Sequence, residues 1–319
     1  MNKRDILLNL LDSNKKLPYT PAAFFLHFGE GYQRGQAAVD RHLEYFRYTG
    51  MDFVKIQYEY PFPPTPQIER PEDWAKMPFH KLDFYEEPLR VVKGLVAAAK
   101  PEALVVLTLY SPFMFARQAV EAVVHQPDAN GKVVEHIRQN PEQVKRGMEI
   151  VTDSLRQFVR ECIRAGLDGF YTSTQGGEVG RVDDAALFDS CIRPYDMALM
   201  AEANQGTLFN ILHVCDYHLP YESLEPFKDY PGQVVSAGLE LAHRKTTPQE
   251  VSTLFKRPFM GGMERLGTIA KGSQAEVRQA ARTALQSASD RFILGADCTV
   301  PGDTNWDNLR TAIEEAHNS

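Results

Sequence analysis

The sequence has few cysteines, no long apolar run and no large excess of charge of either sign. Its 319 residues include only four cysteines, too few for a disulfide framework in a chain of this length, which favours a reducing cytoplasm. The longest apolar run, Leu104–Leu109, is as long as a strand and far shorter than the ~20 residues of a membrane-spanning helix. The amphipathic start of the chain predicts a first helix within residues 1–17 rather than a signal peptide.

Charge and composition exclude several classes of protein. The chain carries 35 basic and 42 acidic side chains, a formal net charge of -7, which argues against a nucleic-acid or anionic membrane surface. With 43% hydrophobic and 24% charged residues, it has the proportions of a globular protein and not of a disordered or fibrous one. There is no solenoid-type repeat and no low-complexity tract. We therefore expect a globular cytoplasmic protein.

Short β-rich apolar runs alternate with longer segments of helical periodicity, the pattern of βα units around a parallel sheet. The eight predicted strands are Thr20–Phe28, Phe53–Tyr58, Leu104–Tyr110, Gly169–Thr172, Thr207–Cys215, Val234–Glu240, Pro258–Met263 and Phe292–Cys298. They predict a single α/β domain over residues 1–319, a (β/α)8 TIM barrel with insertions after the second strand (61–85) and the third (111–140). A doubly wound open sheet is the alternative, but no G-x-G-x-x-G dinucleotide fingerprint follows any strand.

Helix-start and helix-stop residues support the helical segments of this pattern. Asn140-Pro141 and Thr247-Pro248 each place a capping side chain before a proline at the first helical position. They predict helices over 141–165 and 248–255, and the periodicity predicts another over 183–204.

Three possible metal ligands end two of the predicted strands. In the sequence His213-Val214-Cys215, strand alternation directs the imidazole and the thiol to the same face. Cys298 ends the eighth strand, at the same rim of a barrel, where active sites of this fold lie. One imidazole and two thiolates form a zinc-binding set that leaves one coordination position exchangeable. The alternative is that both cysteines are small buried hydrophobes and that His213 is a hydrogen-bonded residue of the barrel interior.

Several segments resemble the uroporphyrinogen decarboxylase superfamily, whose members are (β/α)8 barrels. The resemblance is carried by Phe292–Leu309, by Gly50-Met51-Asp52 and by Leu208–Cys215. Decarboxylases of this superfamily have a Ser-Asp pair at the end of strand two and a Gly-His-Gly motif at the end of strand eight. Here Tyr58-Glu59 and Cys298 stand at those places. The corrinoid-dependent thiol methyltransferases instead carry H-x-C and a distant cysteine as their zinc site, a pattern that His213, Cys215 and Cys298 match.

The resemblance to these methyltransferases implies a function. It implies zinc as the cofactor, a small-molecule thiol of the coenzyme M type as methyl acceptor, and a methylated corrinoid, free or on a partner protein, as donor. It also suggests a homodimer. We expect Glu240, which ends the sixth predicted strand, to be the fourth zinc ligand; the alternative is an ion pair with His243 or Arg244. No catalytic residue is predicted beyond the metal ligands.

Polar residues near other strand ends are candidates for substrate binding. We expect His27, Tyr58, Glu59 and Tyr110 to line the substrate pocket, and Arg34 resembles a residue that binds substrate carboxylates in the superfamily. Two other functions stay open. One is a metal-independent decarboxylase acting on the acetate side chains of a tetrapyrrole. The other is a non-catalytic binder of corrinoids or tetrapyrroles.

Overall fold

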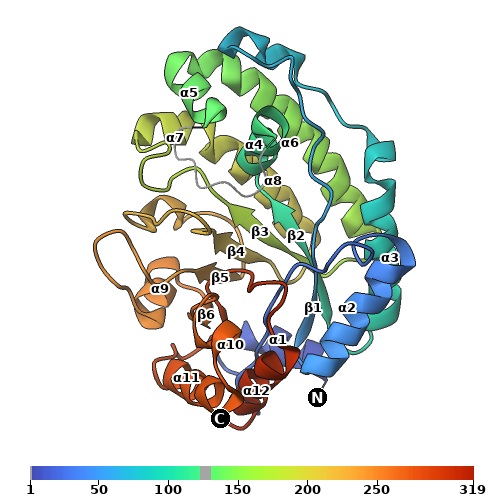
Figure 1. Cartoon of the computed structure of the whole chain (residues 1–319), viewed down its shortest axis with the longest axis vertical. Helices are drawn as coiled ribbons and strands as arrows, with labels where there is room; N and C mark the ends of the chain where they lie inside the picture. Colours follow the sequence, from blue (N-terminus) through green and yellow to red (C-terminus); the bar gives the residue numbers. More distant parts are fainter. Residues whose placement is uncertain (1, 123–130) are drawn as a thin grey trace.

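The computed structural model describes residues 2–122 and 131–319, and in that part of the chain one sheet of seven parallel strands is surrounded by helices (Figure 1). The strands pair in chain order, each with the next. They are β1 (Phe53–Ile56), β2 (Leu104–Tyr110), β3 (Gly169–Thr174), β4 (Ile211–Val214), β5 (Val234–Ala237), β6 (Phe259–Met263) and β7 (Phe292–Ala296). All seven coincide with predicted runs, and nearly every strand residue is buried, as expected for strands covered on both faces.

The first predicted strand, Thr20–Phe28, does not form a strand of the sheet. It makes only two isolated bridges, Ala22 with Leu294 of β7 and Leu26 with Val300. The Ala22 carbonyl accepts a hydrogen bond from the amide of Asp52, the residue before β1, so the segment lies between the two edge strands. A regular ladder is prevented locally because Pro21 has no N–H and the Ala22 N–H donates to the Asp52 carboxylate instead, at 2.7 Å.

Twelve α-helices and three short 3₁₀ helices occupy the described residues. The α-helices are α1 (Lys3–Leu10), α2 (Gly35–Thr49), α3 (Glu86–Ala99), α4 (Pro112–Glu121), α5 (Lys132–Gln139), α6 (Pro141–Arg164), α7 (Ala185–Cys191), α8 (Arg193–Gly206), α9 (Pro248–Phe255), α10 (Thr268–Lys271), α11 (Gln274–Gln286) and α12 (Trp306–His317). The 3₁₀ helices are η1 (Pro71–Lys76), η2 (Leu82–Tyr85) and η3 (Glu225–Phe227). No helix in the described ranges is apolar over a length that would cross a membrane.

The predicted helix over 183–204 is divided in the structure. Asp184 caps α7, and the chain leaves the helical conformation at Ile192, where α8 begins with Pro194 in its first turn. Proline cannot continue a preceding helix because it lacks the amide hydrogen and its ring clashes with the preceding turn. The predicted N-terminal helix is also shorter than 1–17, since α1 ends at Leu10.

The two segments predicted as insertions contain helical turns. Residues 61–85 include η1 and η2, and Trp74 of η1 donates a 2.9 Å hydrogen bond from its indole to His136 of α5. Residues 111–140 include α4 and α5, with 123–130 outside the described residues. Both segments pack beside α6 (Figure 1).

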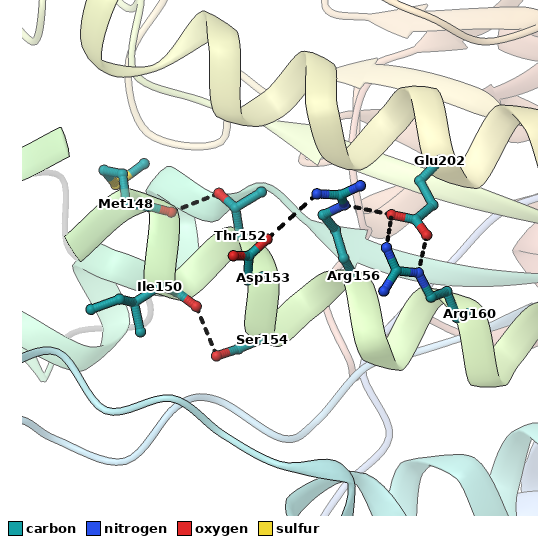
Figure 2. A network of polar contacts seen from close by, with 8 residues as sticks. All are labelled: Met148, Ile150, Thr152, Asp153, Ser154, Arg156, Arg160 and Glu202. Carbon is teal, nitrogen blue, oxygen red and sulfur yellow. Dashed lines mark hydrogen bonds and ion pairs between the residues drawn. The ribbon is translucent and has the colours of Figure 1, made fainter. Parts of the chain in front are cut away.

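The long helix α6 is joined to α8 by a small charge network. Figure 2 shows Arg156 and Arg160 of α6 directed at the carboxylate of Glu202 on α8, and Arg156 also contacts Asp153. Burial of Glu202 is offset by these two guanidinium groups, which lower the pKa of its carboxyl group. The network fixes the two helices to each other beside β3.

Candidate metal centre

His213, Cys215 and Cys298 meet at the carboxyl ends of β4 and β7. One ligand atom from each lies within 4.8 Å of the others, and all three side chains are buried. The two Sγ atoms are 3.9 Å apart. His213 belongs to β4 and Cys215 follows it, whereas Cys298 comes two residues after β7. Curling of the sheet therefore brings together residues that are 83 positions apart. We refer to these three residues as the soft-donor cluster.

The imidazole of His213 is buried without a nitrogen or oxygen hydrogen-bond partner among the described residues. The residue is 1% exposed, and neither ring nitrogen is hydrogen-bonded within the part of the chain that the structure describes. Its ring packs at 5.0 Å, between centroids, from the ring of Tyr171. A buried imidazole with two unused nitrogens is costly unless a ligand is bound. The orphaned ring nitrogens fit a metal ligand better than the hydrogen-bonded residue of the barrel interior that was the alternative.

The two thiols of the cluster differ in their affinity for protons. A hydrogen bond with Cys298 and the charge of His213 bring the pKa of Cys215 well below its ordinary value despite burial. The same hydrogen bond and burial raise the pKa of Cys298 well above its ordinary value. The side-chain amide of Gln175 also donates to the Cys215 Sγ at 3.5 Å. Of the two thiols, Cys215 is therefore the one that loses its proton more readily, and the thiolate is the form that ligates metals.

The donor set of the cluster fits zinc. Zinc binds imidazole nitrogen and thiolate sulfur, and three protein ligands leave a fourth position for a substrate. Soft sulfur ligands disfavour magnesium and calcium, which take oxygen ligands. The residues present thus match a catalytic rather than a closed structural zinc site.

Glu240, the predicted fourth ligand, is not brought to the soft-donor cluster. Strand β5 ends at Ala237, three residues earlier, and Glu240 forms an isolated antiparallel bridge and an ion pair with Lys245. Its side chain is 56% exposed. The ion pair expected as the alternative does form, but with Lys245 and not with His243 or Arg244.

A pocket opens onto the soft-donor cluster. The residues that line it are His27, Lys55, Thr108, Tyr110, Met114, Arg117, Gln118, Tyr171, Ser173, Gln175, His213, Cys215, Tyr217, His218, Cys298 and Thr299. No aspartate or glutamate is among these described lining residues, whereas a lysine and an arginine are. The pocket therefore combines soft donors, aromatic walls and positive charge.

Two of the predicted substrate-binding residues line this pocket. They are His27 and Tyr110. Glu59 lies behind His27, with its carboxylate 2.7 Å from the imidazole Nδ1. This contact fixes the orientation of the ring, as carboxylate partners of histidine commonly do.

Tyr58 and Arg34 are placed away from the pocket lining. The Tyr58 ring is buried among other aromatic rings, including Phe115 and Phe158, each 5.6 Å away between centroids. The Arg34 guanidinium lies 5.3 Å from the centroid of the Tyr60 ring. The structure thus gives both residues packing contacts outside the pocket.

Eleven of the sixteen pocket residues were not predicted from the sequence, among them Lys55, Arg117, Gln118 and Gln175. Gln175 directly follows β3, and Arg117 and Gln118 lie on α4, where Arg117 pairs with Glu121 at 3.0 Å. Lys55 stands within the apolar run of β1. A lysine inside a strand that is otherwise apolar was the one available signal, because buried lysines are rare.

Comparison with known proteins identifies the family. The model of the uroporphyrinogen decarboxylase (URO-D) family matches residues 46–319, and the chain belongs to this family. A comparison with curated proteins returns no match.

Solved structures with the same fold include two kinds of methyl-transferring enzyme. A methyltransferase from Methanosarcina mazei has a TM-score of 0.77 at 12% identity, covering 100% of this chain and 99% of that one. A B12-independent methionine synthase from Shewanella sp. W3-18-1, in complex with selenomethionine, has a TM-score of 0.58 at 12% identity, covering 94% and 97%. At these identities the likeness establishes the fold alone.

Proposed function

We propose that this member of the URO-D family is a zinc-dependent methyltransferase that moves a methyl group from a methylated corrinoid to a thiol. The observation that carries the proposal is the convergence of His213, Cys215 and Cys298, with both imidazole nitrogens unsatisfied, in the lining of one pocket. The names of the structural neighbours, a methyltransferase and methionine synthases, agree with methyl transfer. The corrinoid-bearing partner and the homodimer stay predictions from the resemblance.

In this proposal the residues of the pocket have separate tasks. Zinc held by the soft-donor cluster would supply a Lewis acid that lowers the pKa of an entering thiol and keeps its sulfur nucleophilic. The Gln175 amide orients the Cys215 sulfur. The His27 imidazole, held by Glu59, is the lining group suited to take the proton that the thiol loses. The rings of Tyr110 and Tyr171 limit the access of water to the cluster.

The arrangement favours methyl transfer over tetrapyrrole decarboxylation. The decarboxylases of the resemblance use an aspartate at the end of strand two to hold pyrrole nitrogens. Glu59, which stands near that place, contacts His27 and does not line the pocket. A lining without carboxylates, among the described residues, does not provide the anionic acceptor that an aspartate offers to pyrrole N–H groups.

We also propose that residues 20–28 take the place of an eighth strand between β1 and β7. Their hydrogen bonds to both edges support this position. Slow amide hydrogen exchange at Ala23 and Leu294 would support it, because both amides donate across this junction. Exchange at the rate of an exposed loop would contradict it.

Metal analysis of the purified protein tests the main proposal. We expect about one zinc per chain in the wild type and loss of zinc in the double variant Cys215→Ala, Cys298→Ala. Cys162→Ala is the matched control, since Cys162 is equally buried but lies in α6, away from the cluster. Retention of zinc by the double variant would overturn the proposal.

An activity assay separates the three functions. Methylcobalamin with 2-mercaptoethanol as acceptor is expected to lose its methyl group in the presence of zinc-loaded protein, which is followed by absorbance. Conversion of uroporphyrinogen by the metal-free protein would instead show the decarboxylase. Corrinoid binding without turnover, unaffected by His213→Ala, would indicate a non-catalytic binder.

A further inference from the structure

Lys55 is a buried lysine without a carboxylate partner. It is 5% exposed, in the interior of β1. Its ammonium lies 4.5 Å from the centroid of the Phe25 ring and 4.7 Å from that of Tyr171, and it donates a hydrogen bond to the Gln57 side chain. No ion pair to an aspartate or glutamate reaches it within the described ranges. Such a residue costs stability, so its retention points to a function in the pocket.

The ammonium of Lys55 stands close to the soft-donor cluster. Both line the same pocket, and the Tyr171 ring that contacts the ammonium also packs against the imidazole of His213. The other lysine or arginine of the lining, Arg117, is already neutralised by Glu121. Lys55 is therefore the lining cation, among the described residues, whose charge is not offset by a carboxylate.

The charge of Lys55 depends on negative groups nearby. Burial lowers its pKa to about 7, and negative charge on Cys298, Glu59 or Cys215 opposes this shift. An additional anion in the pocket would favour the ammonium form further, because opposite charges stabilise each other strongly where the dielectric is low.

A count of charges shows when such a cation is needed. Two cysteine thiolates and a neutral imidazole balance the 2+ charge of zinc, so a loaded cluster is neutral. A substrate thiolate would bring the buried centre to a net charge of −1. An uncompensated charge in a buried site is costly, and Lys55 is the lysine of the lining, without an ion pair in the described part of the chain.

We propose that Lys55 is the counter-charge for the bound substrate thiolate, so that it sets the affinity of the centre for thiols and not for the metal. This inference rests on the proposed function, because it assumes that the soft-donor cluster holds a divalent ion. Gln57 positions the ammonium, and its side-chain oxygen is itself held by the Thr108 hydroxyl at 3.1 Å. Lys55 is thus a positioning residue that acts on the reaction through its charge.

The experiment uses the full chain loaded with Co²⁺, whose thiolate charge-transfer absorption reports each sulfur that binds. Wild type, Lys55→Met and Lys55→Arg are titrated with 2-mercaptoethanol. We expect all three to bind one cobalt per chain. Lys55→Met should bind the thiol about tenfold more weakly, because the buried thiolate loses its counter-charge. Lys55→Arg should restore most of the affinity. Lys93→Met, which removes an exposed lysine on α3, is the control and should bind as wild type does.

A stability measurement distinguishes this role from a structural one. Replacing an unpaired buried charge by methionine is neutral or stabilising when the charge has no structural partner, so metal-free Lys55→Met should melt at or above the temperature of the wild type. A lower melting temperature, or an unchanged thiol affinity in the cobalt protein, would overturn the role of Lys55 alone. Failure of the wild type to bind cobalt would overturn the proposed function, and the role of Lys55 with it.

Discussion

Buried polar groups just before the strands of the sheet have several partners, whereas those that line the pocket at the carboxyl ends of the strands have few. At the amino end, the carboxylate of Asp52, just before β1, has three partners: the Tyr19 hydroxyl at 2.8 Å, the Ala22 amide at 2.7 Å and the His317 imidazole at 2.8 Å. These contacts tie together segments from both termini of the chain, so this end of the molecule serves stability.

Asp168, just before β3, repeats this pattern. Its carboxylate pairs with Arg4 at 2.8 Å and with Lys100 at 3.3 Å, and accepts the amide of Val105 at 3.0 Å. The first helix is thereby joined to the loops that precede two strands.

At the carboxyl end, buried polar atoms are left without partners in the described part of the chain. The imidazole of His213 and the side-chain oxygen of Gln118 have no hydrogen bond, and Lys55 has no carboxylate. All three line the pocket. Because native proteins satisfy nearly all buried polar groups, unsatisfied groups that line one pocket mark it as a place for a ligand.

Removing a carboxylate at the amino end of the sheet should have the largest effect on the free energy of unfolding. Asp168→Ala removes the shared partner of two cations and leaves the buried Val105 amide unsatisfied, so we expect a loss of about 3 to 5 kcal/mol in the free energy of unfolding. Urea denaturation measures it. Asp153→Ala, an exposed partner of Arg156 (Figure 2), is the control and should cost less than about 0.5 kcal/mol. Equal losses in the two variants would contradict the comparison.

Removing a donor at the carboxyl end of the sheet should lower the affinity for zinc and leave the stability of the fold unchanged. His213→Ala removes one of three donors, and we expect zinc affinity to fall by more than about 100-fold, beyond the 10- to 100-fold typical of outer-shell changes. Competition with a chromogenic chelator measures this. His243→Ala, which alters an exposed histidine, should leave the affinity unchanged. A strong loss of unfolding free energy in His213→Ala would mean that the imidazole stabilises the fold instead.

A buried acid behind β3 predicts a pH dependence of stability. Burial raises the pKa of Asp196 to about 7, although the Thr174 and Tyr230 hydroxyls donate to it. The folded state therefore keeps a proton that the unfolded state loses above about pH 4. The stabilisation that Asp196 contributes is therefore complete below about pH 4. It declines by about 1.4 kcal/mol per pH unit as the pH rises to about 7. Asp196→Asn should make the decline between pH 5 and pH 6, measured by denaturation, smaller than in the wild type. A slope remains because burial also raises the pKa of Glu178 and of Asp216 to about 7. Parallel slopes would contradict the assignment.

The smallest effect is expected at Glu240. Because its half-exposed carboxylate pairs with Lys245, Glu240→Ala should change the free energy of unfolding by less than about 0.5 kcal/mol. The zinc content should stay at the wild-type level in elemental analysis. Loss of zinc would restore Glu240 as the fourth ligand and show that its loop moves when metal binds.

Some features could be predicted because they depend on local periodicity. The apolar runs from Phe53 onward located all seven strands in order, and Thr247-Pro248 located the start of α9. The H-x-C spacing placed His213 and Cys215 on one face of β4, since strand side chains alternate.

Other features could not be predicted from the sequence because they depend on contacts between distant segments. The run at 20–28 is as apolar as a strand, but the Asp52 carboxylate, from another segment, takes a backbone donor that a ladder would use. Glu240 ends an apolar run in the sequence, whereas the hydrogen-bonded strand stops at Ala237.

The sequence by itself determined the order of strands and helices and the soft chemistry of three side chains, because alternation and donor type are properties of neighbouring residues. Tertiary structure alone decided that two sulfurs 83 residues apart come within 3.9 Å. It also decided that Lys55 joins them in one pocket. The reason is that curling of the sheet and the packing of helices around it determine which strand ends face each other. No local sequence pattern determines the distance between two such ends.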